Sequence, residues 1–125
     1  MIDHVSLGVK DIAKAKAFYD AALSALGYKC LSEGPGYMGY GDSAPRLWVA
    51  AAERPVPADD KSGLHLSFTA ASRAAVDRFY ATALKAGGRD NGKPGLRPNY
   101  GDSYYAAFVI DPDGYRLEAH CGSSA

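Results

Sequence analysis

The feature of this sequence that most constrains its fold is an internal duplication. The run "HVSL" at residues 4–7 recurs as "HLSF" at residues 65–68, and the pair Phe18-Tyr19 recurs at the same offset of 61 residues as Phe79-Tyr80. Near the end of each half, "RLWVAA" (46–51) resembles "RLEAHC" (116–121) at an offset of 70. The nine extra residues of the second half are most easily placed in "NGKPGLRPNYG", which we expect to be a solvated loop. A unit of about 60 residues present twice predicts a duplicated module and not a solenoid, which needs more copies.

Each half predicts the same order of elements. A first strand (2–9 or 63–69) precedes a helix that Asp11 or Ser72 caps, with apolar residues at helical spacing and glycine at its end. Short strands bounded by Gly, Pro and Asp follow, at 28–32, 37–40 and 46–52 in the first half and at 103–110 and 115–121 in the second. The pattern predicts an α+β fold of two βαβββ modules, residues 1–52 and 63–121, joined by linker 53–62 into one domain.

Composition and charge exclude several classes of function. The 14 basic and 14 acidic side chains cancel, so no electrostatic surface for nucleic acid or an anionic membrane is expected. No apolar run approaches the roughly 20 residues that span a bilayer, and no signal region precedes the first strand. With only two cysteines, Cys30 and Cys121, we expect reduced thiols and a cytoplasmic location.

Alternation along the strands predicts which side chains face away from the helices. Val5, Leu7 and Val9 face the helix, which leaves His4 on the other face, and the same rule leaves His65 there. In the last strand Glu118 and His120 share this face, and the repeat aligns Trp48 with Glu118. Two imidazoles and one carboxylate suit Zn, Fe, Mn or Ni and leave coordination positions open. The alternative is that both histidines are merely hydrogen-bonded and that Glu118 is a solvated acid.

The quoted motifs point to a known family. "IDHVSLGVKD", "FYDAAL", "GLHLSF" and above all "YYAAFVIDPDGYRLEAHC" resemble the vicinal oxygen chelate superfamily, over nearly the whole chain. That superfamily includes glyoxalase I, bleomycin- and fosfomycin-resistance proteins, methylmalonyl-CoA epimerase and extradiol dioxygenases. The resemblance implies two modules around a cupped mixed sheet and a divalent metal ion held by His4, His65 and Glu118. It also implies a homodimer, for which the near-apolar strand "YYAAFVI" is a second indication.

The resemblance implies a metal-dependent enzyme that chelates adjacent oxygens of a small substrate: a lyase, a thiol transferase or a dioxygenase. Trp48 stands where glyoxalase I carries a fourth, proton-shuttling ligand, so glyoxalase I activity is not expected. Glu118 and His120 are the candidate catalytic residues, although His120 is equally well interpreted as a rim residue. Trp48, Tyr104, Tyr105 and Arg97 are candidate pocket residues, with the faces of Tyr104 and Tyr105 undecided and a solvated loop the alternative for Arg97. The alternatives for the whole chain are a metal-free small-molecule binding protein of the bleomycin-resistance type and a partner or regulatory module.

Overall fold

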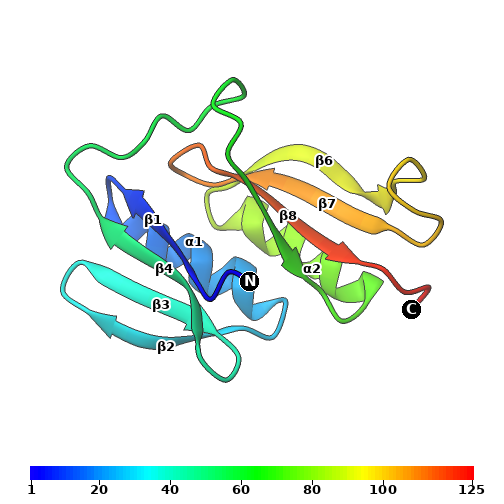
Figure 1. The fold of residues 1–125 in the computed structure, drawn as a ribbon, viewed down its shortest axis with the longest axis horizontal. Helices are drawn as coiled ribbons and strands as arrows, with labels where there is room; N and C mark the ends of the chain where they lie inside the picture. The colour runs from blue at the N-terminus through cyan, green and yellow to red at the C-terminus, as the bar shows by residue number, and fades with distance from the viewer.

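The computed structural model describes residues 1–125 and contains two modules of the same build (Figure 1). The first comprises β1 (Val5–Val9), α1 (Ile12–Ser24), β2 (Lys29–Gly34), β3 (Tyr37–Gly41) and β4 (Pro45–Ala51). The second comprises β5 (His65–Thr69), α2 (Arg73–Lys85), β6 (Arg89–Leu96), β7 (Tyr105–Ile110) and β8 (Arg116–Cys121). The predicted α+β fold of two βαβββ modules is confirmed.

Each module forms its own four-stranded mixed sheet, in the orders β1-β4-β3-β2 and β5-β8-β7-β6. The first strand of each module runs parallel to the last one and lies at an edge of its sheet. Ser6 pairs with Trp48 in the first sheet as Ser67 pairs with Glu118 in the second. Both offsets of the sequence repeat are therefore reproduced in the strand register, which confirms the alignment of Trp48 with Glu118.

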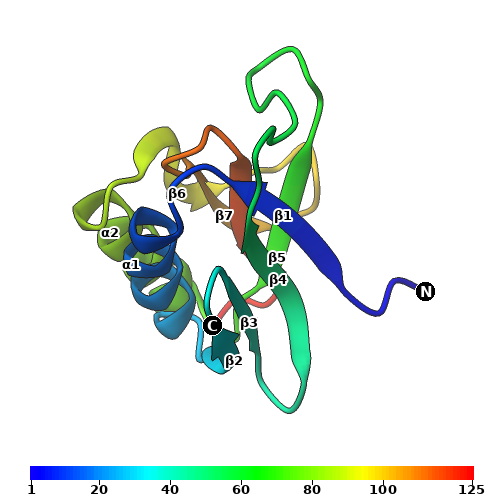
Figure 2. The same ribbon diagram turned by 90° about the vertical axis from the view of Figure 1, so that its left-hand side faces the viewer.

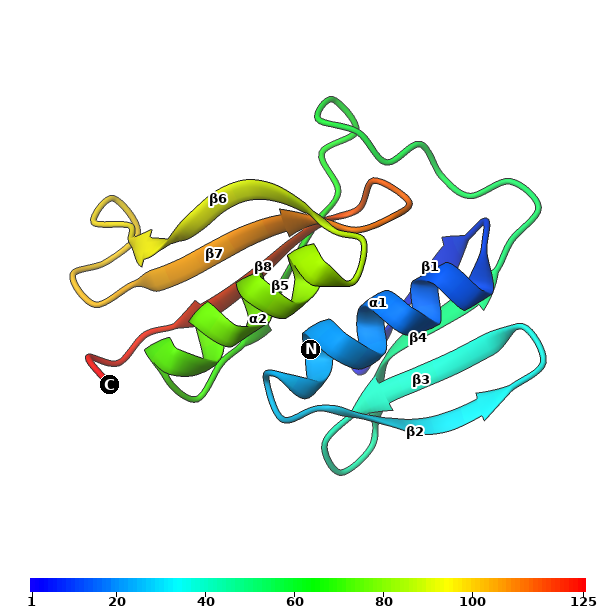
Figure 3. The same cartoon turned by 180° about the vertical axis from the view of Figure 1, so that it is seen from behind.

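Both helices begin and end where the sequence predicts. Asp11 accepts a hydrogen bond from the backbone N–H of Lys14, and Ser72 accepts one from Ala75, as N-caps do. Gly27 (φ +87°) and Gly87 (φ +105°) adopt the left-handed conformation after the helices. The two helices lie side by side on one face of the paired sheets, and the opposite face carries no helix (Figures 2 and 3). The apolar stripes of both helices enter one common core, which includes Phe18, Tyr19, Leu23, Val76, Phe79 and Ala83.

The turn between β7 and β8 joins the two modules. The hydroxyl of Tyr19 on α1 donates to the buried carboxylate of Asp111, which also accepts the backbone N–H groups of Asp113 and Tyr115. The hydroxyl of Tyr115 donates to the carbonyl of Gly8 at 2.6 Å, and Asp113 accepts the N–H of Lys10 at 2.9 Å. The "DPDG" run is therefore a polar joint between the modules as well as a turn.

Residues 91–96, expected in a loop, form most of strand β6 instead. The strand lies at the edge of its sheet, where Pro94 can be accommodated because one side of an edge strand makes no ladder hydrogen bonds. Its register against β7 shifts twice, between Asp90 and Gly92 and between Gly92 and Gly95, so bulges take up extra residues. Glycine and proline both disfavour strands, so local propensity predicted a loop here. The first strand is also shorter than expected and begins at Val5.

Both cysteines are free thiols, as the sequence predicts. None of the helices has the length and apolar character that crossing a membrane requires.

Candidate metal centre

An open depression of about 720 Å³ lies on the helix-free face of the second sheet. The residues that line it are His65, Asn99, Tyr100, Tyr104, Phe108 and Glu118. A smaller cavity of about 390 Å³ lies between the modules, with Val5 of β1 and Leu66 and Phe68 of β5 in its walls. Only the first of these contains imidazole and carboxylate groups side by side.

His65 and Glu118 form the centre of the depression. The imidazole Nε2 of His65 lies 2.7 Å from Oε1 of Glu118, and the Glu118 side chain is only 6 % exposed. They come from adjacent strands, because β5 pairs with β8 in parallel. The shared face that alternation predicts therefore brings two of the three predicted metal ligands into direct contact.

Tyr104 and His120 lie on the same face as Glu118. The Tyr104 hydroxyl donates to Oε2 of Glu118 at 2.6 Å, and its ring stacks on the His120 imidazole with centroids 3.7 Å apart. Desolvation, followed by the hydrogen bond to Glu118, raises the pKa of Tyr104 to about 12, so its hydroxyl stays a proton donor at neutral pH. His120 is thus packed against Tyr104, with Nε2 buried and without a hydrogen-bond partner.

The structure separates the two tyrosines whose faces the sequence left undecided. Tyr105 points to the helix side, where its hydroxyl donates to Asp77 of α2 at 2.7 Å. Of these two tyrosines, only Tyr104 lines the depression.

Arg97 is not among the residues that line the depression, but it lies against one of them, Phe108. Its guanidinium lies 5.3 Å from the ring centroid of Phe108 and donates to the carbonyl of Lys93. Phe108 in turn lies 5.9 Å from the imidazole of His65, centroid to centroid. These contacts give Arg97 a fixed place near the depression.

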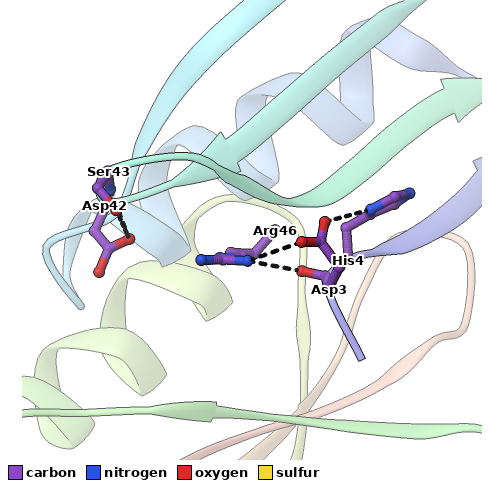
Figure 4. A network of polar contacts seen from close by, with 5 residues as sticks. All are labelled: Asp3, His4, Asp42, Ser43 and Arg46. Atoms are coloured by element: carbon purple, nitrogen blue, oxygen red, sulfur yellow. Dashed lines mark hydrogen bonds and ion pairs between the residues drawn. The ribbon is translucent and has the colours of Figure 1, made fainter. Parts of the chain in front are cut away.

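His4 does not join the pair of His65 and Glu118 within the chain. It precedes β1, and its Nδ1 donates to the Asp3 carboxylate at 2.8 Å, while Arg46 contacts the same residue (Figure 4). The hydrogen bond to His4 and the charge of Arg46 lower the pKa of Asp3. The His4 side chain is 52 % exposed, with Nε2 unpaired. No group of three His, Cys, Asp or Glu side chains in one chain is arranged to hold a metal ion.

Trp48 lies on the helix-free face of the first sheet. Its ring covers Gly39, where an added Cβ would come within 2.6 Å of the indole, and it packs against Tyr37 with ring centroids 6.3 Å apart. Trp48 therefore has the place in the first sheet that Glu118 has in the second, but it lines neither of the two cavities.

Sequence reasoning missed Asn99 and Phe108 among the residues of the depression. Phe108 pairs with Glu118 across β7 and β8, so alternation on β7 could have found it. Asn99 lies in the turn after β6, and no periodic signal marks it.

Comparisons with known proteins agree on one family. The model of the Glyoxalase/Bleomycin resistance protein/Dioxygenase superfamily matches residues 1–119. A glyoxalase/bleomycin resistance protein from Albidiferax ferrireducens T118 is 32% identical, with a TM-score of 0.82, over 94% of this chain and 96% of that one. A glyoxalase-related enzyme from Fulvimarina pelagi (18% identity, TM-score 0.74, covering 96% and 86%) has the same fold. The fosfomycin resistance protein FosX from Listeria monocytogenes has this fold too. It is 16% identical, with a TM-score of 0.72, over 98% of this chain and 93% of that one. A search of curated proteins gives no significant match.

Proposed function

The chain belongs to the glyoxalase/bleomycin resistance protein/dioxygenase superfamily, and from this we propose that it is a metal-dependent enzyme acting on a small substrate with two adjacent oxygen atoms. The observation that carries the proposal is the contact of His65 with the nearly buried Glu118 in an open depression. An imidazole and a carboxylate are suitable donors for Zn, Fe, Mn or Ni.

A third ligand comes from a second chain in this proposal. His4 is equivalent to His65 by the repeat, is half exposed, and keeps Nε2 free while its Nδ1–H bonds to Asp3. A carboxylate on one ring nitrogen commonly orients a metal-binding histidine. We therefore assign the ligand set to His65 and Glu118 of one chain and His4 of the partner subunit.

Two features of the sheets support a homodimer. Strands β1 and β5 both have an edge without a hydrogen-bonded neighbour in the chain. The repeat makes β1 equivalent to β5, so laying β1 of one chain beside β5 of the other brings equivalent positions together. Those positions are His65 and Glu118 on one side and the partner's His4 and the partner's Trp48 on the other.

When bound, the metal ion would polarise the adjacent substrate oxygens and stabilise the negative charge that develops on them. The residues of the chain then have separate tasks. His65 and Glu118 would hold the ion, and the partner's Trp48 would form an apolar wall for the substrate. Arg97, whose guanidinium lies over Phe108, would bind an anionic group of the substrate with the hydrogens that the carbonyls of Lys93 and Leu96 do not use.

The reaction types that fit this site are those of a lyase, a thiol transferase or a dioxygenase. An indole cannot bind the ion or move a proton, so the site lacks the fourth group that glyoxalase I uses. One fold can serve several reactions within a superfamily. The ligand set of two histidines and one glutamate is compatible with all three reaction types.

The experiment that tests the proposal is complementation between two inactive variants. His4→Ala and His65→Ala chains carry different affinity tags other than polyhistidine and are co-expressed, and the doubly tagged heterodimer is isolated and titrated with Zn²⁺. A site shared between chains leaves one intact site per heterodimer and none in either variant homodimer. A heterodimer that binds no more metal than the variant homodimers would overturn the shared site. A wild-type protein that takes up no metal on reconstitution would instead identify a metal-free binding protein.

A further inference from the structure

Both oxygens of the Glu118 carboxylate are occupied, by donors of different kinds. His65 lies 2.7 Å from Oε1, and the Tyr104 hydroxyl donates to Oε2 at 2.6 Å. No lysine or arginine forms an ion pair with this nearly buried carboxylate. A buried carboxylate without a cation needs hydrogen-bond donors to offset its lost hydration. Of the two groups that contact Glu118, His65 is itself a candidate metal ligand and Tyr104 is not.

Packing fixes the position of the Tyr104 hydroxyl. One face of the ring stacks on His120 with an interplanar angle of 20°, and the edge of Tyr100 lies 5.3 Å away, centroid to centroid. The backbone is held as well, because the carbonyl of Tyr104 accepts the N–H of Arg97 at 2.8 Å. The hydroxyl is therefore presented to Glu118 by a ring that has little freedom to turn away.

The two contacts of Glu118 have different fates when a metal ion binds. The contact with His65 joins two candidate ligands, so an ion that both of them hold replaces it. The contact with Tyr104 uses the other oxygen and a donor that is not a ligand in the proposed set, so it persists. We propose that Tyr104 is a positioning residue that holds Glu118 through Oε2 and thereby presents Oε1 to the metal ion.

This inference rests on the proposed function for the metal, and it gives His120 a task as well. His120 supports the Tyr104 ring from one face, where the sequence suggested an acid or base. Glu118 bound through Oε1 alone would take up one coordination position of the ion and not two.

The chain offers a matched control for Tyr104. Tyr105 is the next residue, and its hydroxyl also donates to a carboxylate, that of Asp77, at 2.7 Å, but on the helix side of the sheet. Tyr104→Phe and Tyr105→Phe therefore remove the same kind of bond from opposite faces. The dissociation constant for Zn²⁺ is measured for both by competition with a chromophoric chelator, and the visible spectrum of the Co²⁺-loaded proteins is recorded.

Tyr104→Phe is expected to weaken Zn²⁺ binding about 10- to 100-fold and to change the Co²⁺ spectrum, as loss of a bond to a ligand does. Tyr105→Phe is expected to change the dissociation constant by less than about twofold and to leave the spectrum unchanged. Equal Zn²⁺ affinities for Tyr104→Phe and the wild type, or equal losses in the two variants, would overturn the proposal.

A double-mutant cycle in the metal-free protein separates this inference from the proposed function. Tyr104→Phe, Glu118→Gln and the double variant are unfolded with urea, and the coupling is expected to be at least about threefold in the unfolding equilibrium constant. If the wild type binds no metal, the proposed function is wrong. The coupling energy still tests whether Tyr104 fixes the position of Glu118, because it is measured without metal. If the effects of the two single variants on the unfolding equilibrium are additive, Tyr104 does not fix the position of Glu118.

Discussion

Trp48 occupies in the first module the position that Glu118 occupies in the second. Each lies opposite a serine of the neighbouring parallel strand, Ser6 for Trp48 and Ser67 for Glu118. The duplicated frame has therefore kept its geometry while one of its two equivalent positions carries a carboxylate and the other an indole. Chemistry at this pair of positions can be altered without changing the backbone.

Trp48→Glu should tighten metal binding, because it supplies a second carboxylate at the position equivalent to Glu118. We expect the dissociation constant for Zn²⁺ to fall about tenfold or more, measured by competition titration. Trp48→Gln, which removes the indole without adding a charge, serves as the control. A folded Trp48→Glu protein with unchanged affinity would show that position 48 lies away from the metal.

Wild-type protein loaded with metal should give negligible turnover of the glutathione–methylglyoxal hemithioacetal. The reason is that the indole of Trp48 cannot shuttle the proton that this isomerisation moves. The measurement is the absorbance change of thioester formation with Zn²⁺, Ni²⁺, Mn²⁺ or Fe²⁺ present. Robust turnover with any of these ions would contradict the prediction.

His65→Ala and Glu118→Gln should each weaken divalent metal binding by more than about 100-fold, because loss of a ligand exceeds the effect of losing a residue that supports one. The wild type, purified without a polyhistidine tag, should hold one ion per chain by elemental analysis. Asp77→Asn is the control, since this carboxylate bonds to Tyr105 on the helix side. Metal content below about a tenth of an ion per chain after reconstitution would refute the prediction.

The protein should be a homodimer at micromolar concentration, with twice the mass of the 13.2 kDa chain by light scattering. The reason is that β1 and β5 each leave a sheet edge unpaired. A monomeric mass would refute both the dimer and the ligand from a second chain.

Tyr19→Phe should lower the free energy of unfolding by about 1–3 kcal/mol, because it leaves the buried Asp111 without the hydroxyl of α1. Urea unfolding followed by circular dichroism measures the loss. Tyr80→Phe is the matched control: Tyr80 is equivalent to Tyr19 by the repeat but donates to Asp90, which is exposed. Equal losses in the two variants would contradict a special role for the joint between the modules.

The same joint predicts a dependence of stability on pH. Burial raises the pKa of Asp111 above the ordinary 3.8, against the opposing hydrogen bonds from Tyr19 and Tyr115. The folded protein therefore holds this proton to a higher pH than the unfolded chain does. The stability gained is present in full below pH 3.8 and is lost as the pH rises through the folded-state pKa. Asp111→Asn should remove this loss of stability as the pH rises above 3.8, and parallel profiles for the variant and the wild type would contradict this.

Much of the fold follows from the sequence because its determinants are local. Asp11 and Ser72 cap helices by bonding to residues three positions on, and period-two alternation places His65 and Glu118 on one face. Strand β6 was not predicted, because Gly92 and Pro94 locally disfavour a strand. Its edge position and its bulges, which depend on the neighbouring strand, outweigh that local preference.

The candidate site could be predicted only in part. The repeat shows that His4 and His65 are equivalent, but equivalence does not say which two modules face one another. The direction of Tyr104 likewise depends on how the turn before β7 packs on His120, a contact that no spacing rule encodes. Contacts across long stretches of sequence, such as that of Tyr19 with Asp111, leave no local pattern.

The free edges of β1 and β5 also bear on how large an assembly of this chain can grow. A chain that offers β1 on one module and β5 on the other can close with a second copy into a ring of two, or pass its open edge on to a third. In the proposed homodimer, the angle between the modules, which Tyr19 and Asp111 help to fix, would decide between these two outcomes. If the chain pairs in this way, loosening that angle would let a third copy join at the open edge, so the buried tyrosine would limit the size of the assembly as well as stabilise the fold.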